Sequence, residues 1–481
     1  MEDGGWGLQL GGAARFSRHL LVLLMLALAG AACDSGGEEK EPEVRGAILE
    51  LGHLDHLLEV VEKGGVTYGI VHIYSEAPNY EWVHDDDEGA AALDDAARAA
   101  VVYLRNFELH GDDASRQKAE ALIRFAMFTQ TDEGLFYNFV WNSALEINTT
   151  HQNSVADDVS FWAARGVWAL GTCARVLKQV NAPLSEACAR RVQRIYPQLN
   201  SLLEKYGRTV VQNGRTYPLW LIGETGSDAT SELLLGLSSM QAAYPDPALD
   251  LMIRRFAEGV AMMQFGDVAT FPYGAHASWL ETWHGWGNSQ TQALADAGIL
   301  QSALREADDF YPRLLVNGWL HSIDFADPSR PREFEQIAYA TRGVAVGLVR
   351  LFEKTGQEKY AKLAGIAASW FTGNNVAGVA MYDPETGRGY DGIGASRQVN
   401  YNAGAESTIE ALHTILEVER HPLAQTWMYA RGGSAATREK GGKQYSYRIF
   451  TAGDDSLAIV LNLTDRTTTV LEGAALEEFL R

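Results

Sequence analysis

Acidic residues recur where helices are predicted to begin, and paired carboxyl groups can do chemistry. Asp94-Asp95, Asp157-Asp158 and Glu406 each open a stretch that is rich in small residues. Two facing carboxyl groups can supply a general acid together with a base or nucleophile. A lone acid at a helix start more often only caps free N–H groups and suits the helix dipole. The recurrence at several helix starts is what favours catalysis here.

The acid and base candidates are ranked by their place in these pairs. Asp95 and Asp158 are the main candidates, and Asp94, Asp157 and Glu406 are reserves. Carboxyl groups at close quarters raise one another's pKa values, which would suit a general acid.

Ligand-binding candidates are aromatic, amide or charged residues close to the same helix starts. Aromatic rings stack on the C–H faces of sugars, while amide and charged groups bind hydroxyls or carboxylates. Each aromatic residue could equally be a packing residue. Arg342 is the expected contact to a uronic acid. The set is Tyr80, Asn138, Trp141, Trp162, Arg165, Trp283, His284, Trp286, Arg342, Asp391 and Asn402.

A histidine base is the alternative chemistry. His276, His284 and His321 could abstract a proton in a lyase or epimerase reaction, with His284 best placed between Glu281 and Trp286. The sequence holds no His-x3-His pair and no Cys/His cluster, so we expect no metal site and no cofactor.

Helical periodicity runs from about residue 88 to residue 420. Six helices rich in Ala and Gly are predicted to start near residues 94, 157, 226, 287, 335 and 403. Roughly 62 residues separate them on average, the length of one helical hairpin with its loops. Small residues allow close packing in an inner ring, and the amphipathic helices between them suit an outer ring.

We therefore predict an all-α fold, an (α/α)6 toroid of six helical hairpins, with an open α-solenoid as the alternative. The inner helices of a toroid would point their N-termini at one face, where the acids and aromatics would form an acidic bowl.

The flanks of the helical region differ in pattern. His53 to Lys63 is predicted as a helix and Val66 to Tyr74 as a strand. Apolar runs at 445–450, 457–463 and 467–471 predict a small antiparallel appendage. The expected barrel domain is 46–424 and the expected appendage is 425–481.

The N-terminus has the pattern of an export signal. Arg15 and Arg18 precede an apolar run of about 13 residues, which is shorter than the roughly 20 that span a bilayer. Residues 28–33 resemble a bacterial lipoprotein signal that ends at a lipidated Cys33. We expect a signal peptide at 1–32, a disordered tether at 33–45 and a lipid anchor in the bacterial cell envelope. Simple secretion is the alternative.

Composition narrows the partners of this 481-residue chain. Asp and Glu number 62 against 40 Lys and Arg, and the net charge of −22 argues against nucleic-acid binding. The 12 Trp, 19 Tyr and 17 Phe residues would suit a ligand with flat apolar faces, such as an oligo- or polysaccharide. We expect a monomer. Cys173 and Cys188 could form a disulfide or remain buried thiols.

Four motifs in order resemble bacterial six-hairpin, (α/α)6-barrel glycosidase-like domains. They are Asp94-Asp95-Ala96-Ala97-Arg98-Ala99, the Gly134–Phe139 loop, Asp157-Asp158 with Arg165–Gly171, and Tyr390-Asp391-Gly392 with Asn402–Thr408. The resemblance implies the toroid and carbohydrate handling. Many relatives carry Ser or His where this chain has Asp158-Val159, which leaves open which Asp faces the bowl.

Three functions follow as hypotheses. The leading one is an envelope glycoside hydrolase that uses paired carboxylates. A polysaccharide lyase or sugar epimerase on the same fold is the second. A non-catalytic glycan-binding lipoprotein is the third.

Overall fold

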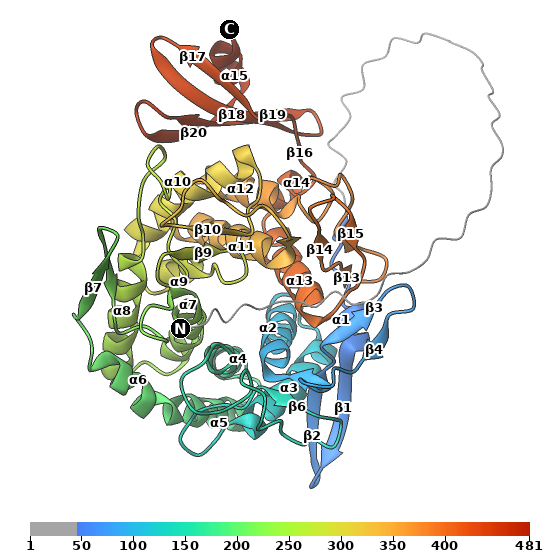
Figure 1. Cartoon of the computed structure of the whole chain (residues 1–481). Helices are drawn as coiled ribbons and strands as arrows, with labels where there is room; N and C mark the ends of the chain where they lie inside the picture. The colour runs from blue at the N-terminus through green and yellow to red at the C-terminus, as the bar shows by residue number, and fades with distance from the viewer. Residues whose placement is uncertain (1–45) are drawn as a thin grey trace, which may run out of the picture. The chain divides into compact units, whose positions relative to one another are not determined.

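Six helical hairpins follow one another in the computed structural model, which describes residues 46–481 (Figure 1). The inner helices are α2 (Leu93–His110), α4 (Phe161–Val176), α7 (Ser227–Ala243), α9 (Gln290–Asp296), α11 (Ala338–Thr355) and α13 (Ala405–Glu419). The outer helices are α3 (Asp113–Thr129), α5 (Ala182–Arg194) with α6 (Tyr196–Leu203), α8 (Pro247–Met262), α10 (Leu300–Asn317), α12 (Glu358–Ala368) and α14 (Pro422–Trp427).

The inner helices form a closed ring. Each one packs against the next in chain order, and α13 packs back against α2. This closure confirms the (α/α)6 toroid and excludes the open solenoid.

Small residues bring the inner helices to backbone contact. A Cβ atom added at Gly171 of α4 would lie 2.1 Å from the carbonyl oxygen of Gly236 in α7, and one added at Gly236 would lie 2.4 Å from that of Val167. No larger side chain fits at either position without separating the two helices. The Ala- and Gly-rich composition of the inner helices thus has the packing cause that the sequence indicated.

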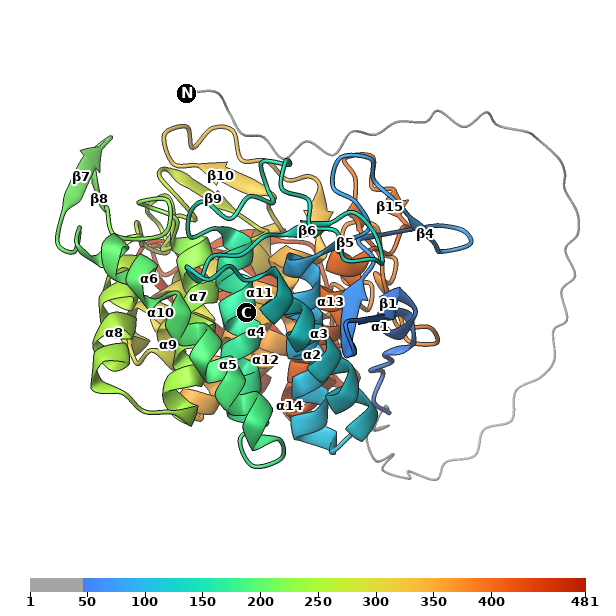
Figure 2. The same ribbon diagram turned by 90° about the horizontal axis from the view of Figure 1, so that it is seen from below.

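The loops that precede the inner helices gather at one end of the ring, which we call the loop face (Figure 2). Short antiparallel pairs brace it: β5 (Ala91–Ala92) with β6 (Phe139–Val140), β7 (Thr209–Gln212) with β8 (Arg215–Pro218), β9 (Thr282–His284) with β10 (Ser322–Asp324), β12 (Tyr382–Asp383) with β13 (Arg388–Gly389), and β14 (Gly392–Ile393) between β11 (Gln336–Ile337) and β15 (Val399–Asn400).

The N-terminal flank differs from the prediction. The helix expected over His53–Lys63 ends early as α1 (Gly52–Leu57), and the rest is strand β1 (Leu58–Lys63), paired with β2 (Val66–Val71). Gly64 and Gly65 both have positive φ, which lets the chain turn back in two residues. The strand predicted over Val66–Tyr74 is confirmed as far as Val71, where β2 ends. Tyr74 instead begins β3 (Tyr74–Glu76), which pairs with β4 (Glu81–Val83).

The second inner helix also begins later than predicted. Ser160 caps α4 by accepting a hydrogen bond from the N–H of Ala163, so Asp157 and Asp158 lie in the loop before the helix. The capping hydroxyl, rather than the acid pair, sets the first turn.

The C-terminal strands form a sheet that packs on α10. Its strands are β16 (Arg431–Gly432), β17 (Ala436–Lys440), β18 (Lys443–Ala452), β19 (Asp455–Asn462) and β20 (Thr467–Glu472). Leu476 and Phe479 of the last helix, α15 (Gly473–Leu480), pack on Ala458 and Val460 of the sheet.

The predicted signal peptide, Cys33 and the tether fall within residues 1–45, outside the described residues. Within 46–481 no helix has the length and apolar character needed to cross a membrane. Cys173 and Cys188 are both buried free thiols.

Candidate functional site

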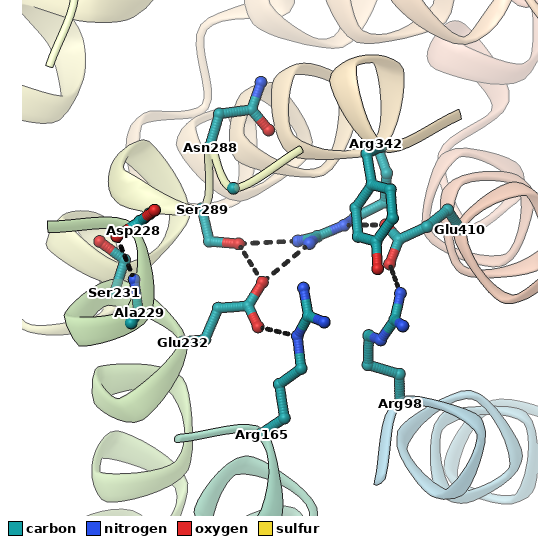
Figure 3. A network of polar contacts seen from close by, with 12 residues as sticks. Arg98, Arg165, Asp228, Ala229, Ser231, Glu232, Asn288, Ser289, Arg342 and Glu410 are labelled. Carbon is teal, nitrogen blue, oxygen red and sulfur yellow. Dashed lines mark hydrogen bonds and ion pairs between the residues drawn. The ribbon is translucent and has the colours of Figure 1, made fainter. Parts of the chain in front are cut away.

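Charged side chains from the second turns of five inner helices join across the centre of the barrel (Figure 3). Arg165 donates to Glu232 at 2.5 Å, and Arg342 donates to Glu232 at 3.3 Å and to Glu410 at 2.6 Å. Arg98 donates to Glu410 at 2.8 Å. All five residues are at most 5% exposed. We call this set the ionic ring.

Asp94 and Ser289 complete the ring. Asp94 Oδ2 accepts from Arg98 at 3.1 Å and also from Arg165, and Ser289, at the start of α9, accepts from Arg342 at 2.9 Å. Although burial alone would raise it, Arg342 and Arg98 lower the pKa of Glu410 to about 2. Glu410 is therefore ionised, and every inner helix or its N-terminal cap contributes a residue to the ring.

Three carboxyl groups cluster one turn above the ring, at the loop face. Oxygen atoms of Asp94, Asp95 and Glu406 lie within 4.8 Å of one another. All three bind the same guanidinium, that of Arg98. Burial raises the pKa of Asp95, and its side chain is only 3% exposed. The Glu406 side chain is 53% exposed, so it is the member of this cluster that a ligand can reach.

Glu406 is held from one side only. Its Oε1 accepts from the Tyr339 hydroxyl at 2.7 Å and from Arg98 at 3.3 Å. The Tyr339 ring lies 4.9 Å from the guanidinium carbon of Arg98 and 5.5 Å from that of Arg165. Two cations thus fix the ring that orients the carboxylate.

Asp391 is bound at the start of α13 and lies in a more buried setting than Glu406. Its Oδ1 accepts from the Ser407 hydroxyl at 2.7 Å and from the Gly404 N–H at 3.3 Å, in the first turn of α13. Burial raises the pKa of Asp391 to about 6, although those two hydrogen bonds act to lower it. The charges of Glu406 and Glu335 also act to raise it. A carboxyl group with this pKa can hold a proton near neutral pH and release it.

Tyr74 and Glu88 belong to the same neighbourhood, and neither is among the site residues predicted from the sequence. The Tyr74 hydroxyl donates to Glu88 Oε2 at 2.7 Å. Burial raises the pKa of both groups, and the charge of Glu406 contributes to each rise. Glu88 ends an acidic run, Asp85 to Glu88, which looks like a solvated turn in the sequence.

A histidine–carboxylate pair lies on the α7 side of the loop face. His284 Nε2 is 3.0 Å from Asp228 Oδ2, and the imidazole stacks on Trp286 with 3.9 Å between ring centroids. Burial lowers the pKa of His284 and so favours the neutral ring, although the hydrogen bond to Asp228 acts in the opposite direction. Nδ1 is buried and has no hydrogen-bond partner within 46–481.

Several candidate ligand contacts support the structure instead. Arg165 and Arg342 are buried in the ionic ring, which leaves Arg342 no exposed face for a uronic acid. Trp283, the middle residue of β9, is fully buried, and its ring packs edge to face on Phe310. Asn138 accepts from the N–H of Asp94 at 3.0 Å and so caps α2.

Other candidates lie at the margins of the loop face. Asp157 and Asp158 are exposed, and Trp141 and Trp286 are half-buried. Trp162 donates its indole N–H to the Phe136 carbonyl at 2.7 Å.

Tyr80 and Asn402 lie where β3 and β4 meet the start of α13. Tyr80 is 9% exposed, and Asn402 Oδ1 accepts from the Ala77 N–H at 3.1 Å.

The acids are thus not spread evenly over six helix starts. Glu281 accepts from Gln212 and Asn213 and so fastens the β7–β8 hairpin. Glu224 pairs with Lys205 at 2.9 Å. The carboxyl groups that share one arginine with two other carboxyl groups lie on α2 and α13.

No protein-family model and no curated protein match this sequence. Among solved structures, a cellobiose 2-epimerase from Bacillus thermoamylovorans B4167 aligns with a TM-score of 0.53 and 14% identity, over 73% of this chain and 92% of that one. A sugar epimerase from a ruminal bacterium aligns with a TM-score of 0.54 and 12% identity, over 79% of this chain and 97% of that one.

The fold is that of the six-hairpin glycosidases. A cellobiose 2-epimerase from Spirochaeta thermophila DSM 6192 shares it, with a TM-score of 0.52 and 10% identity, over 75% of this chain and 91% of that one. These neighbours are carbohydrate-active enzymes. At such identities the likeness establishes the architecture alone. The chemistry of this chain depends on its own residues.

Proposed function

We propose that this protein is a glycoside hydrolase in which Asp391 is the general acid and Glu406 is the base or nucleophile. The observation that carries the proposal is the contrast between these two carboxyl groups beside the same helix, α13. Burial gives Asp391 a pKa of about 6, whereas Glu406 is open to solvent and held by Tyr339 and Arg98.

The roles follow from glycosidase chemistry. The protonated carboxyl of Asp391 would give its proton to the oxygen of the leaving sugar. The Glu406 carboxylate would then either take a proton from the attacking water or bond to the anomeric carbon. A separation of about 5–5.5 Å between the two working carboxyl groups accompanies retention of configuration, and about 6.5–9.5 Å accompanies inversion.

This assignment revises the ranking made from the sequence. Asp95 binds Arg98 at 2.8 Å beneath Glu406, where its nearly complete burial suits an electrostatic role. Asp158 is an exposed loop residue, and its participation stays a prediction. Glu406 and Asp391, previously a reserve and a binding candidate, become the central pair.

A saccharide as substrate has two further supports. Tyr74 places a half-buried aromatic side chain among the carboxyl groups, a combination that suits the apolar faces and hydroxyls of a sugar. The structural neighbours named above are described as epimerases of sugars.

Sugar epimerisation is the second candidate function. The Asp228–His284 pair favours it, because a carboxylate that binds one imidazole nitrogen leaves the other free to act as a base. His284 is fully buried, so this chemistry would first require movement of Trp286.

One panel of acidic and neutral oligosaccharides separates these reactions. Hydrolysis releases new reducing ends, which mass spectrometry detects as a gain of water. Epimerisation leaves the mass unchanged in normal water and incorporates deuterium from heavy water, and lyase action raises the absorbance near 235 nm. Deuterium uptake without new reducing ends would replace the hydrolase proposal with the epimerase one.

Export and lipid anchoring complete the proposal. The apolar run that ends at Cys33 supports lipidation at that residue. In a bacterial host the full chain should take up labelled palmitate and fractionate with membranes, and Cys33→Ala should abolish both. Labelling that persists in the variant would contradict this part.

A further inference from the structure

Arg388 is a cation whose situation differs from that of the ring arginines. It lies in β13, half-buried, three residues before Asp391. Its Nε is buried and has no hydrogen-bond partner in the described part of the chain. Asp383 is its cross-strand neighbour, but that carboxylate accepts from Thr386 and Glu385 instead. A desolvated guanidinium nitrogen without an acceptor is unfavourable, and a bound anion would relieve it.

One aromatic ring lies over this guanidinium, and two more lie in its neighbourhood. Its central carbon lies 3.9 Å from the centroid of the Tyr80 ring. The rings of Tyr390 and Tyr401 meet edge to face with 5.0 Å between centroids, and Tyr401 is 46% exposed. An arginine stacked on a ring keeps its in-plane N–H groups free for a carboxylate or sulfate. An exposed tyrosine beside it can stack on a sugar.

The backbone fixes how this cluster stands beside Asp391. A Cβ atom added at Gly389 would lie 2.4 Å from the Ser407 carbonyl oxygen, so β13 lies directly on the first turn of α13. Asp391 also turns to that helix, through its bond to Ser407. Arg388 and Tyr390 contact Tyr80 and Tyr401 instead. The alternation of side chains along an extended segment thus separates the anion-binding candidates from the acid.

We infer that Arg388, Tyr80, Tyr390 and Tyr401 form a subsite for an anionic sugar unit, carrying either a carboxylate or a sulfate ester. The unit would neighbour the one held at Asp391, since Tyr390 and Asp391 are consecutive. This inference rests on the proposed function of the adjacent site, and it gives to Arg388 the uronic-acid contact that the sequence suggested for Arg342.

Direct binding tests the subsite without requiring turnover. The full chain, as wild type and as Arg388→Gln, is titrated calorimetrically with trigalacturonic acid, its carboxyl-reduced counterpart and a sulfated galactose trisaccharide. We expect wild type to prefer an anionic probe, and Arg388→Gln to weaken binding of that probe by about tenfold without affecting the reduced one. Arg388→Lys should restore part of the preference, because it restores the charge.

Arg190→Gln is the matched control, since Arg190 is an exposed arginine on outer helix α5. It should leave all three affinities unchanged. Which of the two anionic probes binds more tightly identifies the anion. Equal wild-type affinity for charged and reduced probes, binding of neither anionic probe, or an equal loss for all probes in Arg388→Gln would overturn the subsite. Anion-selective binding by a chain that hydrolyses nothing would instead uphold the subsite and refute the proposed hydrolase.

Discussion

The barrel holds two layers of charged side chains that differ by one helical turn and by how completely they are paired. In the lower layer, Glu232 and Glu410 each bind two arginines, and all are buried. In the upper layer, Asp95 and Glu406 share Arg98, and Asp94, which also binds Arg165, joins the two layers. Residue type therefore does not distinguish a structural carboxylate from a reactive one. The number of cations within reach and the exposure to solvent do.

Glu410 in the lower layer and Asp391 beside the upper layer lie in opposite electrostatic environments. Arginines lower the pKa of Glu410 to about 2, whereas burial and neighbouring acids raise that of Asp391 to about 6. Glu410 therefore stays ionised and joins Arg98 of α2 to Arg342 of α11. Asp391 and Glu88, beside the upper layer, both have raised pKa values, and a carboxyl group of this kind can hold a proton that chemistry can use.

Breaking the lower layer should have the largest effect. Glu410→Gln leaves Arg98 and Arg342 buried with one carboxylate fewer, and such losses reduce the free energy of unfolding by about 3–5 kcal/mol. Urea denaturation measures it. Glu358→Gln, whose side chain is 72% exposed, should change it by less than about 0.5 kcal/mol. Equal stability of the two variants would contradict a structural ring.

The raised pKa of Asp391 should appear in the pH dependence of stability. Because its folded pKa exceeds the unfolded value, folding binds a proton between about pH 4 and 6, and wild-type stability falls as pH rises through that window. Asp391→Asn has no carboxyl group to titrate at this position. The free energy of unfolding of the variant, relative to that of wild type, should therefore increase by about 2 kcal/mol between pH 4 and pH 7. Parallel curves from urea titrations would refute the shift.

Removing the Tyr339 hydroxyl should separate catalysis from stability. Tyr339→Phe keeps the ring between the two arginines and removes the hydrogen bond to Glu406, so kcat should fall by about tenfold with little change in KM. Tyr360→Phe is the control, because that hydroxyl binds Asp308 between outer helices. A similar fall in kcat in both variants would indicate a general structural effect.

The smallest effect should come from a charge at a distance. Glu335 is exposed, and its charge helps to raise the pKa of Asp391. Glu335→Gln should therefore move the alkaline limb of the kcat/KM profile to lower pH by about 0.3 unit. A shift to higher pH, or the same shift in Glu333→Gln, would contradict that coupling.

The six hairpins could be predicted because their cause is local. Ala and Gly recur at the helix faces that must touch, as the Gly171–Gly236 contact shows. Leu58–Lys63 belongs to a stretch whose pattern predicts a helix, yet it forms strand β1. The strand forms because the turn at Gly64-Gly65, outside this stretch, brings β2 back to pair with it.

The site was harder to predict, because its roles depend on contacts between distant helices. The sequence suggests that Arg342 could bind a ligand. In the structure its guanidinium binds Glu232 and Glu410, which lie on two other helices. The ionic ring could have been expected from the charged residues that interrupt helices made mostly of small residues. Glu88 and Tyr74 carried no such signal, because only the folded chain brings them near Glu406.

The turnover of Glu406→Gln tests the central claim most directly. On an oligosaccharide that the wild type hydrolyses, kcat should fall by about a thousandfold while the free energy of unfolding stays within about 1 kcal/mol of wild type. Glu333→Gln, the same change at an exposed residue, should keep wild-type kcat. Wild-type kcat in Glu406→Gln would show that the exposed carboxylate of the upper layer is not the catalytic one.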